Sequence, residues 1–199
     1  MNREQFIKVL KREGYSYEME GDRIVVNVDI INVPYKNVNL RDLTSLPPGV
    51  EFKNKGDVDL KSLTSLPPDV VFSNKGEVNL LSLTSLPSGV EFKNRGRVSL
   101  KSLTSIPSGF QFNNRGDIHM NALTSLPPGV KFKNKGDVWL ADLSSISPDV
   151  EFRNGDDVYL RSLIGGSTLD GWIKDWKGNI EGIDPKRLLN VMIKQGVFI

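Results

Sequence analysis

The sequence of 199 residues has no cysteine, a single histidine and almost no excess of charge of either sign. Without cysteine the chain has no disulfide, no thiolate nucleophile and no cysteine-bound zinc, which suits a reducing compartment. The 26 basic residues nearly balance the 24 acidic ones, which argues against a protein that binds polyanions over its whole surface. No apolar run has the length of a membrane span and the first residues do not resemble a signal peptide, so we expect a cytoplasmic protein with no membrane partner.

Residues suited to catalysis or metal binding are also scarce. His119 follows Asp117 by two residues, but a catalytic triad needs a positioned serine, and Ser99 is one of many surface serines. Gly-Asp corners such as 56–59 resemble calcium-binding β-roll turns, yet those turns need a nine-residue period. We therefore expect no enzymatic activity, no metal and no cofactor.

What the sequence does contain is a strict repeat. Six consecutive copies of a 20-residue unit run from Leu43 to Ser162, and the first reads LTSLPPGVEFKNKGDVDLKS. Val50 with Phe52, and Val58 with Leu60, have the alternation of strands with one buried face, while the leucines that begin each copy supply a third apolar side. Three apolar sides joined by turns form one coil, and stacked coils pair as parallel strands about 4.8 Å apart. We predict a mainly β fold, a right-handed β-solenoid of six coils.

One corner of every coil carries an asparagine. The column is unbroken and consists of Asn54, Asn74, Asn94, Asn114, Asn134 and Asn154. Asparagine bonds its own backbone in turns, and the glycine that follows it favours a tight corner. The stacked amides could also form a hydrogen-bonded ladder along the solenoid.

The segments outside the repeats are predicted to cover its two ends, within one cooperative domain. Residues 1–42 form an N-terminal cap with a helix over 2–13 that Asn2 and Gln5 cap, a hairpin over 15–28 and a partial coil over 38–42. Residues 43–162 form the six repeats, and residues 163–199 form a C-terminal cap with a helix that has Asp184 as its N-cap and Pro185 at its first position. Trp172 and Trp176 of that cap form either a lid over the last coil or a docking site.

The segment VDLKSLTSLPP, residues 58–68, resembles the L-x-L…L-T-x-L-P stretch of bacterial leucine-rich repeats. The chain is also similar to short repeat proteins of bacteriophages and uncultured viruses. The resemblance implies a protein-binding scaffold, encoded by a phage and acting on a host target. Here Leu63 follows Leu60 by three residues and the asparagine lies in the opposite corner, which favours a straight solenoid over a curved horseshoe.

The most variable column of the repeat gives the first candidate site. Between the buried residues of the second strand lie Asp59, Asn79, Ser99, His119, Trp139 and Tyr159, and strand alternation points them outward. Neighbouring Trp, Tyr and His side chains are typical anchors for a partner protein. We predict a protein-binding face of His119, Trp139 and Tyr159, flanked by Lys101, Asn121 and Arg161. Drift at an unconstrained surface position is the alternative interpretation.

A basic corner gives the second candidate site, for nucleic acid or another polyanion. It consists of Lys53, Lys55, Lys75, Lys93, Arg95, Arg115, Lys133, Lys135 and Arg153. Carboxylates such as Glu51 and Asp57 lie two residues to either side of this stripe. Interleaved charge also keeps a repeat surface soluble and prevents slipped stacking, so both interpretations stay open.

Overall fold

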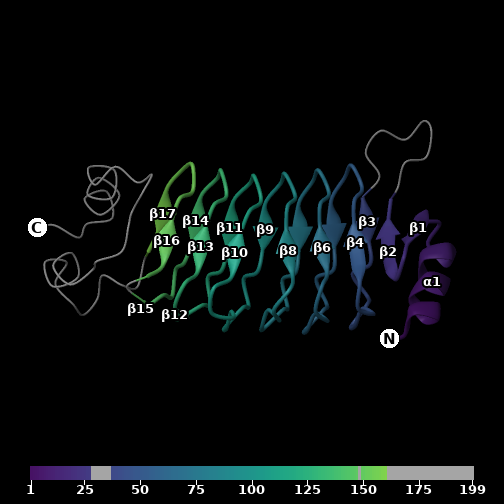
Figure 1. Cartoon of the computed structure of the whole chain (residues 1–199), viewed down its shortest axis with the longest axis horizontal. Coiled ribbons are helices and arrows are strands. Elements are labelled where there is room, and N and C mark those ends of the chain that lie inside the picture. Colours follow the sequence, from purple (N-terminus) through teal and green to yellow (C-terminus); the bar gives the residue numbers. More distant parts are fainter. Residues whose placement is uncertain (28–36, 148, 161–199) are drawn as a thin grey trace, which may run out of the picture.

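We describe a computed structural model of the chain for residues 1–27, 37–147 and 149–160. The chain forms an elongated β-solenoid of about six turns, with a helix at its N-terminal end (Figure 1). Parallel strands pair residues that lie 20 positions apart, for example Phe52 with Phe72, so the predicted solenoid and its period are confirmed. The handedness of the coil stays a prediction, and the predicted C-terminal cap with Trp172 and Trp176 lies outside the described residues.

Two sides of each coil are strands of two or three residues. One side forms a seven-stranded parallel sheet in the order β17-β14-β11-β9-β7-β5-β3. Its strands are β3 (Val38–Asn39), β5 (Val58–Asp59), β7 (Val78–Asn79), β9 (Val98–Ser99), β11 (Ile118–His119), β14 (Val138–Trp139) and β17 (Val158–Tyr159). The other side holds β4 (Val50–Phe52), β6 (Val71–Phe72), β8 (Glu91–Phe92), β10 (Gln111–Phe112), β13 (Lys131–Phe132) and β16 (Glu151–Phe152). The third side is paired at two places among the described residues, between β12 (Ser125–Leu126) and β15 (Ser145–Ile146) and at a bridge from Ser85 to Ser105.

The core is a set of apolar columns that run along the solenoid. The phenylalanine column stacks ring on ring, with centroids 5.4 Å apart for Phe52 and Phe72 and 4.9 Å apart for Phe132 and Phe152. Leucines of the third side, such as Leu63, are fully buried against it. Because each coil presents the same apolar set, stacking buries what a single coil could not.

Phe110 interrupts this regularity. It stands in a column where the other five repeats have valine, and its ring lies 4.8 Å from that of Phe112. The Phe92 and Phe112 rings are 6.0 Å apart, which is wider than the other steps of the column. Among the described residues β8 and β10 are not paired, so this side divides into a five-stranded sheet ending at β8 and a three-stranded sheet of β10, β13 and β16. The bulk of the extra ring is the physical reason for the break.

The N-terminal helix and hairpin are confirmed. Helix α1 (Arg3–Arg12) begins with a capping box between Asn2 and Gln5, and it buries Phe6 and Leu10. Strands β1 (Tyr17–Glu20) and β2 (Arg23–Val26) form an antiparallel hairpin, and β2 continues the solenoid by pairing in parallel with β4.

The hydroxyl of Tyr15 closes the exposed edge of β3. It accepts a hydrogen bond from the backbone N–H of Asn39 at 2.8 Å, and it lies 3.4 Å from the carbonyl oxygen of the same residue, to which it donates. One side chain thus occupies backbone groups that would otherwise offer an edge to another strand.

Candidate functional site

The seven-stranded sheet presents its outer face to solvent through two columns of side chains. In every strand the first residue is buried, and in all of them except β3 the second is half-buried, as for Val138 and Trp139 in β14. The second residues form the variable column, and the residues two positions earlier lie beside them on the same face because side chains alternate along a strand. The outer face is therefore a flat array in which the backbone repeats and the side chains differ.

The aromatic stack occupies the C-terminal part of this face. It consists of His119, Trp139 and Tyr159, which occupy the same position of the paired strands β11, β14 and β17. The Trp139 and Tyr159 rings are stacked with centroids 3.8 Å apart and planes 9° apart. The His119 ring lies 5.5 Å from that of Trp139 and is tilted by 38°. The structure therefore brings these three predicted site residues together.

The residues predicted to flank the stack are placed less uniformly. Lys101 is exposed and Asn121 is half-buried, each two residues beyond a member of the variable column. Ala141 takes the equivalent position beside Trp139, so the middle of the stack has no polar flank on that side. Arg161 lies outside the described residues.

A column of carboxylates borders the stack on its other side. Asp117, Asp137 and Asp157 each precede their strand by one residue and lie half-buried on the outer face. The backbone N–H of Asp137 donates to Oδ1 of Asp117, and that of Asp157 donates to Oδ1 of Asp137, both at 3.0 Å. Asp117 and Asp137 thus each accept a hydrogen bond from the next coil with one oxygen. Sequence analysis considered these carboxylates only as charge interleaved with the basic corner, although their position two residues before the variable column is the signal that they share its face.

The three carboxylates form no ion pair among the described residues, although Arg97 takes the equivalent position in the coil before Asp117. Across residues 1–27, 37–147 and 149–160, no lysine or arginine forms an ion pair with Asp117, Asp137 or Asp157. At the equivalent position two coils earlier, Oε2 of Glu77 accepts a hydrogen bond from Nη2 of Arg97 at 2.9 Å. The outer face is therefore charge-compensated near its middle and negative beside the aromatic stack.

Burial and these charges shift three pKa values. Burial raises the pKa of Asp137, and repulsion from Asp117 raises it further, while the N–H of Asp157 works in the opposite direction. Burial and then Asp137 raise the pKa of the Tyr159 hydroxyl. Burial and then Arg97 lower the pKa of His119, which outweighs the opposite effect of Asp117. The stack is therefore an environment that disfavours both additional negative charge and a charged imidazole.

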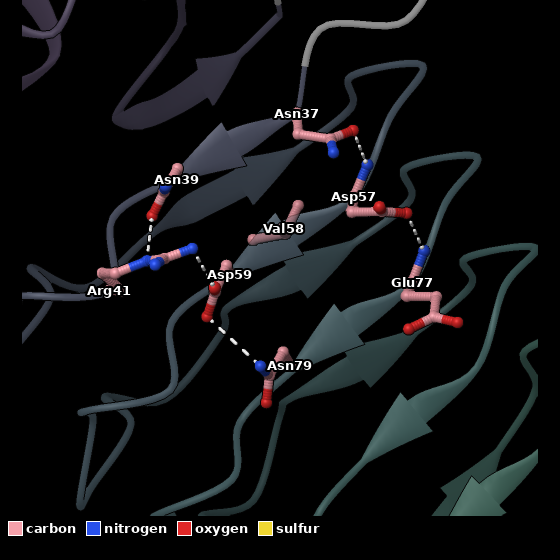
Figure 2. A pocket seen from close by; sticks show the side chains of 8 residues that line it. All are labelled: Asn37, Asn39, Arg41, Asp57, Val58, Asp59, Glu77 and Asn79. Atoms are coloured by element: carbon pink, nitrogen blue, oxygen red, sulfur yellow. Dashed lines mark hydrogen bonds and ion pairs between the residues drawn. The ribbon is translucent and has the colours of Figure 1, made fainter.

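The N-terminal part of the outer face contains a polar hollow of about 180 Å³ (Figure 2). Its side chains satisfy one another. Arg41 donates to Oδ1 of Asn39 at 2.9 Å and to Oδ2 of Asp59 at 3.2 Å, and Asn79 donates to Oδ1 of Asp59 at 3.3 Å (Figure 2). The hollow is smaller than the usual range of small-molecule pockets, about 300–1,000 Å³. The sequence did not predict it, because it depends on how side chains of three coils meet.

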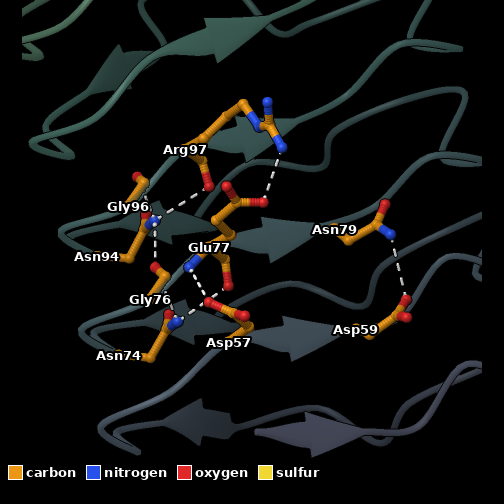
Figure 3. Close-up of polar contacts among 9 residues, drawn as sticks. All are labelled: Asp57, Asp59, Asn74, Gly76, Glu77, Asn79, Asn94, Gly96 and Arg97. Atoms are coloured by element: carbon orange, nitrogen blue, oxygen red, sulfur yellow. Dashed lines mark hydrogen bonds and ion pairs between the residues drawn. The ribbon is translucent and has the colours of Figure 1, made fainter.

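The corner asparagines bond to backbone rather than to one another. Nδ2 of Asn74 donates to the carbonyl oxygens of Gly76 in its own coil at 3.1 Å and of Gly56 in the preceding coil at 3.0 Å. Asn94 repeats this pattern with Gly96 and Gly76 (Figure 3). In the same view the N–H of Glu77 donates to Oδ1 of Asp57, as in the carboxylate column. The amide-to-amide ladder is therefore replaced by amide-to-carbonyl bonds, which lie within each coil and, for Asn74, Asn94 and Asn134, also reach the preceding coil.

The basic corner is exposed along its whole length, as its nine residues are all exposed. Part of it is neutralised, because Lys93 pairs with Glu91 and Arg153 pairs with Glu151 at 2.8 Å. Within the part of the chain that the structure describes, no carboxylate pairs with Lys75, Arg95, Arg115 or Lys135.

Comparison with protein-family models, with curated proteins and with solved structures finds no match to this chain. The described residues include no helix with the length and apolar character that crossing a membrane requires. They also include no group of three or more His, Cys, Asp or Glu side chains placed to bind a metal ion.

Proposed function

We propose that the chain is a non-enzymatic repeat scaffold that binds another protein through the outer face of its seven-stranded sheet. The aromatic stack carries this proposal. Two large rings lie half-buried in contact on a surface whose backbone is rigidly repeated. A partner that covers them removes apolar surface from water, and little side-chain entropy is lost because each ring already packs on its neighbour. The resemblance to leucine-rich repeats and to short bacteriophage repeat proteins supports a phage-encoded, cytoplasmic scaffold acting on a host target.

The test is capture of partners from bacterial lysate by the immobilised chain, followed by affinity measurement on each captured protein. The variant is Trp139→Ala/Tyr159→Ala, and the matched control is Asn79→Ala/Ser99→Ala in the same column of earlier coils. Truncation of one such anchor costs about 2 kcal/mol, roughly thirtyfold in affinity. We expect loss of that size or more in the aromatic variant and little change in the control. Equal affinity of a folded aromatic variant would exclude this face.

A second function, binding of nucleic acid or another polyanion, is favoured by four basic-corner cations in one column, Lys75, Arg95, Arg115 and Lys135, for which the described residues supply no carboxylate partner. They lie in successive coils, about 4.8 Å apart, and form a continuous cationic line. The test is binding of a single-stranded oligonucleotide at several salt concentrations. If all four contact phosphates, changing them together to glutamine reduces the slope of log K against log salt by about 3, at about 0.7 per contact. An unchanged slope would remove this function.

A further inference from the structure

We propose that the partner docks a basic α-helix along the outer face, with a row of Arg or Lys side chains on Asp117, Asp137 and Asp157 and apolar side chains on Trp139 and Tyr159. This inference rests on the proposed function, and it adds the chemistry and shape of the partner. It depends on three properties of the face, which are its charge, the orientation of its rings and its repeat distance.

The charge of this part of the face calls for a cationic partner. Asp117, Asp137 and Asp157 follow one another in adjacent coils, and Asp156 lies close enough to raise the pKa of Asp137. Among the described residues none of these four carboxylates has an ion-pair partner. The polar hollow at the other end is different, because Arg41 pairs with Asp59 and Arg97 pairs with Glu77, which leaves Asp57 as the lining carboxylate without an ion pair among the described residues. A cationic segment is therefore more complementary to the aromatic end of the face than to the hollow.

The orientation of the rings assigns the cation to the carboxylates. Trp139 and Tyr159 stack across adjacent coils, so their faces point along the solenoid axis and their edges point outward. The edge of an aromatic ring is the positive part of its quadrupole and does not attract a cation, whereas the covered face would. The rings therefore offer apolar contact, and the neighbouring carboxylates hold the charge. Long basic side chains suit both the rings and the carboxylates, because their methylene stems pack on apolar surface while the charged end reaches a carboxylate.

The repeat distance favours a helix over an extended segment. Adjacent carboxylates of the column are about 4.8 Å apart, and alternate ones about 9.6 Å apart. On a helix, residues three or seven positions apart are separated by about 4.5 Å and 10.5 Å along the axis. In an extended strand, residues on one face are about 6.7 Å apart, so the second such step already overshoots the column by several ångströms. A helix with one basic residue per turn therefore matches the spacing of the coils.

The test uses two fluorescently labelled peptides of about 20 residues, designed to be helical. The first carries Arg once per turn with Leu alongside it, and the second carries Glu in place of Arg. Fluorescence anisotropy measures binding to the full chain and to three variants: Asp137→Asn/Asp157→Asn, Trp139→Ala/Tyr159→Ala and Asp57→Asn. Asn keeps the Oδ1 acceptor, so these changes remove charge and keep the hydrogen bonds between coils. Asp57 is the matched control because its Oδ1 accepts from Glu77 as that of Asp137 accepts from Asp157.

We expect the Arg peptide to bind the wild type, with affinity reduced by about twofold to thirtyfold by Asp137→Asn/Asp157→Asn and unchanged by Asp57→Asn. The Glu peptide should not bind, and the aromatic variant should bind the Arg peptide more weakly than the wild type does. The inference is overturned if the Arg peptide does not bind, if both peptides bind equally, or if Asp57→Asn has the same effect as the double change. The lysate capture is judged separately. Suppose that captured partners still need Trp139 and Tyr159 for binding, but the Arg peptide does not bind. The proposal of a basic helix is then wrong, and the proposal of a protein-binding face stands.

Discussion

The ring of Tyr159 lies 3.8 Å from the ring of Trp139, with the planes of the two rings only 9° apart. The relationship follows from the repeat, since the two residues are 20 positions apart and are aligned by the parallel pairing of β14 with β17. The same register would place any two side chains of this column in contact. Because the repeat supplies the geometry, a change of one residue per coil is enough to change what the face can bind.

Leu100→Ala tests whether stability resides in the stacked apolar columns. Leu100 is fully buried, with neighbouring coils on both sides, so we expect a loss of about 2–5 kcal/mol in the free energy of unfolding. Leu81→Ala is the matched control. Leu81 is 40% exposed, so its substitution should lower the free energy of unfolding much less. Urea unfolding followed by circular dichroism measures both. Equal effects of the two changes would mean that the leucine columns are not the core.

Asn94 tests the amide bonds at the corner. Its Nδ2 donates to the carbonyl oxygen of Gly96 at 2.8 Å, and the side chain is fully buried. Asn94→Ala takes the amide donor away from the part-buried carbonyl of Gly96, so we expect a loss of about 1–3 kcal/mol in the free energy of unfolding. Asn94→Asp should cost more, because a buried carboxylate would face the same carbonyls. A corner that tolerated both changes in urea unfolding would not depend on these bonds.

Much of the fold could be predicted from the sequence, because a fixed period makes every side chain appear in a column. The alternation of Val58 and Leu60 assigned the buried face, and Asn2 with Gln5 assigned the helix start. The role of Tyr15 could not be predicted, since its hydroxyl meets the backbone of Asn39 only after the chain folds back. The break at Phe110 depends on how an extra ring is accommodated between coils, which spacing alone does not determine.

The candidate site was predicted in part for the same reason. The variable column and the adjacency of Trp139 and Tyr159 follow directly from the period. The sequence gives no sign of which carboxylates find a cation, because that depends on side-chain reach: Arg97 pairs with Glu77, while Asp137 has no such partner among the described residues. Side-chain reach also decides that the corner amides bond to carbonyls and not to one another.

His119 makes stability depend on pH. Its folded-state pKa lies below the ordinary value, with burial as the main cause and Arg97 as the next. The unfolded chain therefore takes up a proton that the folded chain excludes as pH falls below about 6.5, and stability is lost toward acid. Relative to His119→Gln, the wild type should lose free energy of unfolding between pH 7.5 and 5.5. Parallel curves for the two proteins in urea unfolding would contradict this.

Asp137 should make the folded chain less stable as pH rises, which is opposite to the effect of His119. Burial, with repulsion from Asp117, raises its folded-state pKa, so its favourable contribution is complete below the unfolded value of about 3.9 and is lost as pH rises through the folded value. Asp137→Asn cannot lose this contribution and keeps the acceptor for the N–H of Asp157. We expect the variant to gain stability relative to wild type as pH rises from 3 to 7, measured by urea unfolding at each pH. If the difference in free energy of unfolding between the two proteins is constant across this range, the folding of the chain does not raise the pKa of Asp137.

The central claim is that a partner covers the aromatic stack, and the fluorescence of Trp139 reports on it most directly. The chain has three tryptophans, so Trp172→Phe/Trp176→Phe leaves Trp139 as the single emitter. Acrylamide quenching is then measured for this variant, free and saturated with a protein captured from lysate. The account predicts a blue-shifted emission and a several-fold smaller quenching constant in the complex. Unchanged emission and quenching at saturation would place the partner elsewhere on the solenoid and contradict the account.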